Sequence, residues 1–103
     1  MKYQEIREKV LAAAQQANAM GLIHGTCGNI SMRDATDDVV AITPSNMPYD
    51  SLKPEDITVI DLHGNIVDGA YIPSSETPMH TAVYRARPDI RAIVHTHSLY
   101  ATV

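Results

Sequence analysis

The hydrophobic period changes after Gly21, and this change restricts the possible folds more than any other feature of the sequence. Before Gly21, apolar side chains recur every three or four residues, as they do on one face of an α-helix. Residues 2–20 are therefore predicted to form an amphipathic helix, with Gly21 as a left-handed cap. After Gly21 the apolar residues stand in short runs with β-branched side chains, which favour strands. The chain therefore combines a long helix with a sheet.

Two β-hairpins are predicted in the middle of the chain. Residues 43–56, which lie between them, carry three prolines and several turn formers, so we expect an ordered loop there, with a single helical turn at 53–56. In the second hairpin, His63-Gly64 marks the turn, because glycine supplies the positive φ that a tight turn needs. The hairpins are expected to pair residues 29–33 with 39–43 and residues 57–62 with 65–67.

A second helix and a last strand are predicted in the C-terminal third. Thr77 supplies an N-cap and Pro78 the first helical position, so the helix should begin there and stop before Pro88. The apolar density of residues 90–97 then predicts a buried strand. Helix, two hairpins, helix and strand imply an α/β layered domain with a mostly antiparallel sheet.

Size and charge exclude several classes of function. A chain of 103 residues can form one domain with one core. The net charge is -4 and no Lys/Arg cluster is present, which argues against a nucleic-acid partner. No apolar stretch approaches the roughly 20 residues of a membrane span, and the charged N-terminus is unlike a signal peptide. We therefore expect a cytoplasmic protein with neither nucleic acid nor membrane as partner.

His95 and His97 are candidate metal ligands near the C-terminus. In a strand, side chains two residues apart project to the same face, about 6.6 Å from one another along the chain. Neutral imidazole is a common ligand of Zn²⁺, and catalytic zinc sites typically use three protein ligands. Two histidines do not complete such a site, and histidines at this spacing are often only solvated or hydrogen-bonded. The spacing alone therefore leaves metal binding open.

Ser74-Ser75-Glu76 stands immediately before the predicted second helix. Hydroxyls and unpaired backbone N–H groups at a helix N-terminus can bind an anion such as phosphate. A glycine-rich loop that holds Thr26 and Asn29 offers similar chemistry, because glycine lets backbone amides approach a ligand closely. The alternative is that the first segment merely caps the helix and the second is merely a turn. The residues by themselves leave both possibilities open.

Four motifs together resemble the class II aldolase/adducin family: GTCGNISMR, ITPSNMPYDSL, PSSETPMH and AIVHTHS. The resemblance spans the chain from the first helix to Val103, and within the family it is strongest to the aldolases that act on L-fuculose 1-phosphate. It implies an α/β/α sandwich around a central, mainly antiparallel sheet, and a homotetramer. It also implies a zinc ion held by three histidines. His95 and His97 correspond to two of them. The third comes from a later segment, so residues 1–103 resemble a single, truncated domain.

The same resemblance assigns roles to other residues. Glu76 corresponds to the catalytic carboxylate of the family. Members commonly have glycine at the position of Asn46, in a T-P-x-G turn, and asparagine tolerates the left-handed region better than most residues, so we expect the turn to survive. The positions that correspond to phosphate-binding residues are Thr26, Asn29, Ser45, Asn46, Ser74 and Ser75.

The resemblance implies cleavage of a ketose 1-phosphate, similar to L-fuculose 1-phosphate, into dihydroxyacetone phosphate and an aldehyde. Zinc would act as a Lewis acid that stabilises an enediolate, and Glu76 would transfer the proton. Contacts to the phosphate would orient the reacting carbons. In the family the third histidine and a proton-donating tyrosine come from the second half of the fold. We therefore expect residues 1–103 alone to be inactive.

Other members of the family suggest alternatives. An L-ribulose-5-phosphate 4-epimerase would break and remake a similar bond, but that branch usually resembles S-S-D, and Glu76 favours the aldolases. Dehydratases and other sugar-phosphate lyases form a further group. A non-catalytic, adducin-like assembly module would differ in class. Its mark would be the loss of the metal histidines, and His95 and His97 are both present.

Overall fold

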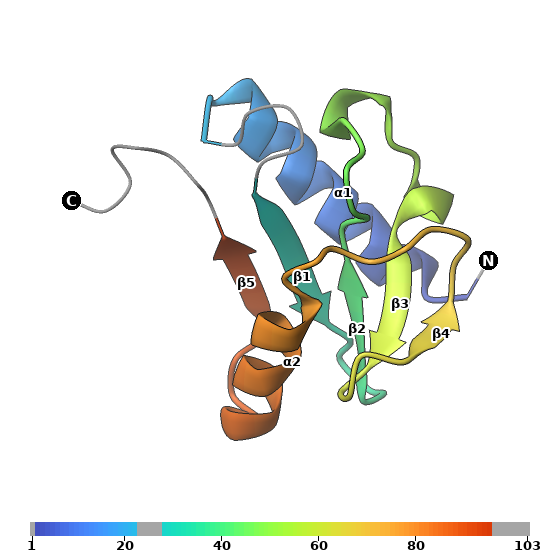
Figure 1. Ribbon diagram of the computed structural model, residues 1–103, viewed down its shortest axis with the longest axis vertical. Helices are drawn as coiled ribbons and strands as arrows, with labels where there is room; N and C mark the ends of the chain where they lie inside the picture. The colour runs from blue at the N-terminus through green and yellow to red at the C-terminus, as the bar shows by residue number, and fades with distance from the viewer. Residues whose placement is uncertain (1, 23–27, 96–103) are drawn as a thin grey trace.

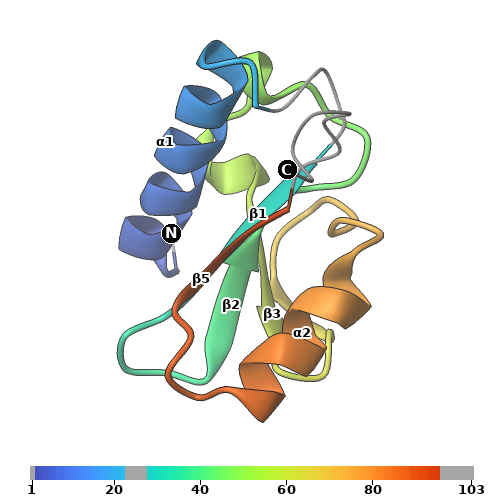
Figure 2. The ribbon, with the colours of Figure 1, turned by 90° about the vertical axis from the view of Figure 1, so that its left-hand side faces the viewer.

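An antiparallel sheet lies between two helices in the computed structural model, which describes residues 2–22 and 28–95 (Figures 1 and 2). The strands are β1 (Asn29–Arg33), β2 (Val39–Ile42), β3 (Thr58–Asp61), β4 (Ile66–Asp68) and β5 (Ala92–His95). Their order across the sheet is β4-β3-β2-β1-β5, and each neighbouring pair is antiparallel. Helix α1 (Gln4–Ala19) covers one face and α2 (Thr77–Ala86) covers the other. These layers confirm the predicted α/β/α sandwich.

Helix α1 buries the apolar stripe that the sequence predicts. Val10 and Ala14 are fully buried at its centre, where they pack against Ile30 of β1. Burial of one large apolar side chain stabilises the fold by about 1.5–3 kcal/mol, so this stripe holds the helix on the sheet. The helix ends as predicted: Gly21 has a φ of 75°, and the Leu22 N–H bonds back into the last turn. Helix α1 begins at Gln4, two residues later than expected.

Both predicted hairpins are present. The first matches its expected bounds closely, whereas the second has a longer turn than predicted. The carboxylate of Asp61 accepts backbone N–H bonds from His63 and Asn65, and Gly64 has a φ of 88° within the same turn. The expected helical turn forms as η2 (Pro54–Asp56). A second short helix that the sequence did not predict, η1, spans Tyr49–Ser51.

Two predictions about the C-terminal third need correction. Glu76, rather than Thr77, occupies the N-cap of α2, because the Thr77 hydroxyl donates to the Ser74 carbonyl and is drawn into the helix. Strand β5 is not buried: it lies at the sheet edge, and Val94 is 57% exposed. The apolar density of the segment reflects its composition, whereas its burial depends on the elements packed against it. The part of the predicted strand after His95 lies outside the described residues.

Candidate functional site

Four segments that are distant in the sequence meet at one end of the sheet. The first residue of β1, Asn29, pairs with the last residue of β5, His95. Beside them, Thr43 follows β2 and exchanges hydrogen bonds with Ile30, its N–H donating to the Ile30 carbonyl at 3.0 Å. The Ser74 N–H donates to the Thr43 carbonyl at 3.0 Å, which attaches the segment before α2 to the same end. Tertiary hydrogen bonds therefore bring segments from all four motifs together.

The Ser45-Asn46 turn lies beside the segment that leads to α2. The Ser45 N–H donates to the Ile72 carbonyl at 2.9 Å, and Pro44 forms an isolated bridge with Pro73. Asn46 has a φ of 59°, the left-handed conformation that we expected asparagine to accept in place of glycine. Two of the segments predicted to bind phosphate are therefore neighbours in space.

The start of α2 is ordered by its own hydroxyls. The Ser74 hydroxyl accepts the Glu76 N–H at 3.2 Å, and the Thr77 hydroxyl donates to the Ser74 carbonyl at 2.6 Å. Ser75 is exposed and Glu76 is half-buried. The Glu76 side chain makes no capping hydrogen bond to the helix. Its carboxylate therefore does not cap the helix.

A buried hydrogen-bond network runs from β5 into α2. The Nδ2 of Asn29 lies 3.4 Å from the Nδ1 of His95, and the Oδ1 of Asn29 contacts the Nε2 of His80. The Nδ1 of His80 lies 2.6 Å from the hydroxyl of Ser31, which in turn lies 2.8 Å from the hydroxyl of Tyr84. Of these residues, Ser31, His80 and Tyr84 are fully buried and Asn29 is 3% exposed. We refer to the five residues as the buried network.

His80 and Tyr84 of the buried network are held in their neutral forms, because burial shifts the pKa of each. Burial, with a smaller contribution from the charge of His95, lowers the pKa of His80 to about 4. Burial also raises the pKa of Tyr84, although the Ser31 hydroxyl and the Arg33 charge oppose this change. At neutral pH the His80 ring is therefore uncharged, with one donor nitrogen and one acceptor nitrogen. Such a ring can connect a donor on one side to an acceptor on the other.

Several predicted site residues can now be placed. Asn29, Ser45, Asn46, Ser74 and His95 lie in the segments that meet at this end of the sheet. Both polar atoms of the Asn29 amide contact histidines, but its nitrogen carries two hydrogens, so one of them can still be donated to a phosphate. Thr26 and His97 lie outside the described residues.

The donor chemistry at this end suits a divalent metal, although the described residues supply only part of a site. His95 is half-buried and presents an imidazole, a ligand type that zinc prefers. Within residues 2–22 and 28–95, no group of three or more His, Cys, Asp or Glu side chains is placed to hold a metal ion. Any complete site must therefore draw on residues beyond these ranges.

His80 is the residue whose role the sequence did not reveal. Its position four residues after Glu76 would allow the two side chains to touch. Instead the ring points inward and contacts Asn29 and Ser31. The available signal was periodicity, because His80 shares the buried stripe of α2 with Thr77 and Tyr84.

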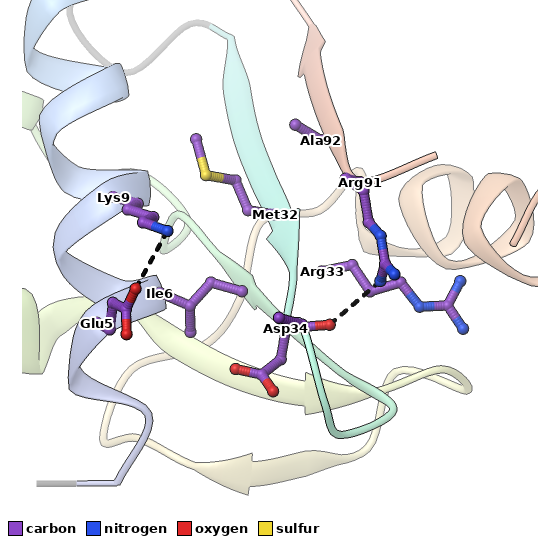
Figure 3. Close-up of a pocket in the computed structure, with 9 residues that line it drawn as sticks. Glu5, Ile6, Lys9, Met32, Arg33, Asp34, Arg91 and Ala92 are labelled. Atoms are coloured by element: carbon purple, nitrogen blue, oxygen red, sulfur yellow. Dashed lines mark hydrogen bonds and ion pairs between the residues drawn. The ribbon is translucent and has the colours of Figure 1, made fainter. Parts of the chain in front are cut away.

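A separate cavity of about 370 Å³ lies on the α1 side of the sheet (Figure 3). Its lining mixes charges of both signs, including Glu5 and Lys9 of α1, which form an ion pair, and Arg91 before β5. None of the predicted catalytic, phosphate-binding or metal-binding residues lines it. This cavity is therefore distinct from the candidate site.

Among the described helices, none is long and apolar enough to cross a membrane.

Comparison with known proteins identifies the relatives of this fold. The chain is 45% identical over 101 residues to a 5-deoxy-D-ribulose 1-phosphate aldolase from Bacillus thuringiensis serovar kurstaki, covering 98% of this chain and 47% of the relative. A solved L-fuculose 1-phosphate aldolase is 38% identical with a TM-score of 0.90, covering 99% of this chain and 48% of that one. A putative aldolase/epimerase/decarboxylase from Klebsiella pneumoniae is 32% identical with a TM-score of 0.87, over 99% and 48%.

The chain therefore spans about half the length of these relatives. Residues 8–103 match the family described as the Class II Aldolase and Adducin N-terminal domain. The order of the four motifs, the layered fold and the relatives agree with one another. The chain belongs to the class II aldolase and adducin family.

Proposed function

We propose that the protein that carries this chain is a zinc-dependent aldolase that cleaves a ketose 1-phosphate to dihydroxyacetone phosphate and an aldehyde. The observation that carries the proposal is the meeting of His95 with the Ser45 and Ser74 segments at one end of the sheet. A candidate metal ligand and two candidate phosphate-binding segments thus share one region. The names of two relatives support the substrate class, since both act on 1-phosphates of ketoses.

His95 and His97 would hold the zinc ion, together with a histidine from outside this chain. When bound, zinc would supply a Lewis acid that draws electrons from the substrate carbonyl and so weakens the neighbouring carbon–carbon bond. The imidazole donors suit this ion better than they suit magnesium or calcium, which prefer oxygen ligands. We expect the complete protein to be a homotetramer in the cytoplasm, as the family resemblance implies.

The residues of this chain would bind the substrate and transfer a proton. The side chains of Ser45 and Asn46 and the hydroxyls at the start of α2 would bind the phosphate, because hydrogen-bond donors and the helix dipole favour an anion there. Glu76, half-buried at that helix start, would carry the proton at its carboxylate. Binding at the phosphate holds the reacting carbons in place and so lowers the entropic part of the barrier.

The test uses the intact protein and measures zinc content and cleavage of L-fuculose 1-phosphate and 5-deoxy-D-ribulose 1-phosphate. Glu76→Gln should lower kcat by about 10²- to 10⁴-fold and leave the zinc content unchanged, because it removes the proton carrier alone. His95→Ala should lower the zinc content. His63→Ala is the matched control, since His63 is exposed at a hairpin turn and should alter neither quantity.

Two results would contradict the proposal. The first is a zinc content that His95→Ala leaves unaltered. The second is epimerisation of L-ribulose 5-phosphate in place of cleavage, which would favour the epimerase alternative, one of the three activities in the name of the Klebsiella relative. A metal-free, inactive tetramer would instead favour the adducin-like assembly module. Zinc-dependent turnover by residues 1–103 alone would contradict our expectation that this part is inactive.

A further inference from the structure

The hydrogen bonds of the buried network all point in one direction. The Nδ2 of Asn29 can only donate, so the Nδ1 of His95 accepts from it. The Oδ1 of Asn29 can only accept, so the Nε2 of His80 carries the proton. The Nδ1 of His80 then accepts from Ser31, and the Ser31 oxygen accepts from Tyr84. Donation therefore runs from Tyr84 through Ser31, His80 and Asn29 to His95.

Burial makes this arrangement specific. A buried polar atom that loses its partner costs about 1–3 kcal/mol, and water cannot replace a partner for Ser31 or His80, which are fully buried. The His80 ring is held on both sides, and it in turn holds the Asn29 amide in one orientation. That amide in turn contacts the Nδ1 of the His95 ring.

We propose that His80 is a positioning residue, which acts through Asn29 to hold the His95 ring for metal binding through Nε2. We also propose that metal binding reverses the direction of donation in the part of the network that runs from His95 through Asn29 and His80 to Ser31. The inference rests on the proposed role of His95 as a metal ligand. It extends that role to residues in α2 and β1 that would not touch the metal.

The reversal follows from the chemistry of imidazole. A metal on Nε2 leaves the ring proton on Nδ1, which then donates instead of accepting. Asn29 must turn its amide so that the oxygen faces His95 and the nitrogen faces His80. The Nε2 of His80 then accepts, so its proton moves to Nδ1 and faces Ser31. His80 thus changes tautomer and keeps its charge, although Asn29 separates it from the metal ligand in the network.

The first experiment reads the tautomers by ¹⁵N NMR of the histidine rings in the intact protein, free of metal and loaded with Zn²⁺. Resonances are assigned by their loss in His80→Gln and His95→Ala. We expect the Nε2–H form of His80 in the metal-free protein and the Nδ1–H form after zinc binds. The same His80 tautomer in both states, with zinc bound to His95, would overturn the reversal.

The second experiment compares two variants of the same residue. In His80→Gln the longer side chain can still reach Asn29, whereas His80→Asn can reach only Ser31. Partners of metal ligands typically affect metal affinity by about 10- to 100-fold. We therefore expect His80→Asn to weaken Zn²⁺ binding by about that factor and His80→Gln to bind zinc far more like the unmodified protein. His63→Asn, on the exposed hairpin, is the control.

The outcomes separate this inference from the proposed function. Unchanged zinc affinity in both His80 variants, with binding still dependent on His95, would overturn the inference and leave the function intact. Absence of zinc binding would overturn the function. In that case the inference is tested in the metal-free protein by the tautomer of the His95 ring. We expect one tautomer in the unmodified protein and a mixture of both tautomers in His80→Asn. An unchanged single tautomer in that variant would overturn it.

Discussion

The two faces of the sheet are packed with different chemistry. On the α1 face the buried residues are almost all apolar, from Ile6 in the helix to Ile57 before β3, and Arg7 is the main exception. On the α2 face a small apolar cluster around Tyr84 shares the interior with Ser31 and His80. Apolar contacts dominate the first face, whereas the interior of the second also holds a chain of side-chain hydrogen bonds.

This difference separates stability from site geometry. Apolar burial is proportional to area and has no preferred direction, so the α1 face can stabilise the fold without fixing any one side chain. A hydrogen-bond network works only when each partner is in place. The candidate metal ligand His95 is attached to the α2 face through Asn29. We therefore expect damage to the α1 face to lower stability, and damage to the α2 face to alter the site as well.

The largest effect should come from the α1 face. Ile57 is fully buried there, so Ile57→Ala should lower the free energy of unfolding by about 3 kcal/mol through lost burial and a residual cavity. Zinc affinity should not change. Urea denaturation of the metal-free protein and a zinc titration measure the two quantities, and Ile66→Ala, at an exposed position, is the control. Weaker zinc binding by Ile57→Ala would contradict the expectation that damage to the α1 face lowers stability without altering the site.

The α2 face should show a pH dependence of the order of 2 kcal/mol. The pKa of His80 is lowered from 6.5 to about 4 in the folded protein, so the folded state binds fewer protons than the unfolded state between these values. Its contribution to stability is therefore complete above about pH 6.5 and is lost as the pH falls toward 4. Denaturation across this range should show the loss in the unmodified protein and not in His80→Gln. Parallel curves for the two proteins would contradict the prediction.

Removal of the Ser31 hydroxyl tests whether the α2 face behaves as a network. Ser31→Ala removes the Ser31 hydroxyl that the Nδ1 of His80 and the hydroxyl of Tyr84 both contact, so we expect a loss of about 1–3 kcal/mol. Addition of Tyr84→Phe should cost little more, because the hydroxyl that it removes has already lost its acceptor. A double-mutant cycle measured by denaturation checks this coupling. Strict additivity would mean that the contacts are independent.

The smallest effect should come from the ion pair between Arg7 and Asp68 on the α1 face, in which the Asp68 side chain is 42% exposed. Arg7 is 2% exposed and pairs with Asp68, and its Nε has no hydrogen-bond partner among the described residues. The free-energy cost of taking the Arg7 charge out of water offsets much of its attraction to Asp68. Arg7→Met should therefore change stability by no more than about 1 kcal/mol. Thermal denaturation measures this. A loss of about 3 kcal/mol or more in the free energy of unfolding is typical when one partner of a buried pair is removed. That result would show that the α1 face also depends on a directional contact.

The elements that local chemistry controls could be predicted from the sequence. Gly21 and Gly64 have the positive φ values that their turns require, and Asn46 adopts the left-handed conformation expected of it. The two α-helices and both hairpins lie close to the positions predicted from the spacing of apolar residues and from the turn residues. Burial of β5 was mispredicted because exposure depends on distant elements, and the N-cap of α2 was mispredicted because the Thr77 hydroxyl bonds to Ser74.

The sequence by itself determined the elements, the fold class and the types of residue available for a site, because periodicity, turn preference and side-chain chemistry act over a few residues. Only the tertiary structure decided which buried polar groups meet. Asn29 lies 51 residues from His80 and 66 from His95, yet contacts both. Those contacts depend on how α2 and β5 pack on β1, a long-range geometry to which no local pattern is sensitive.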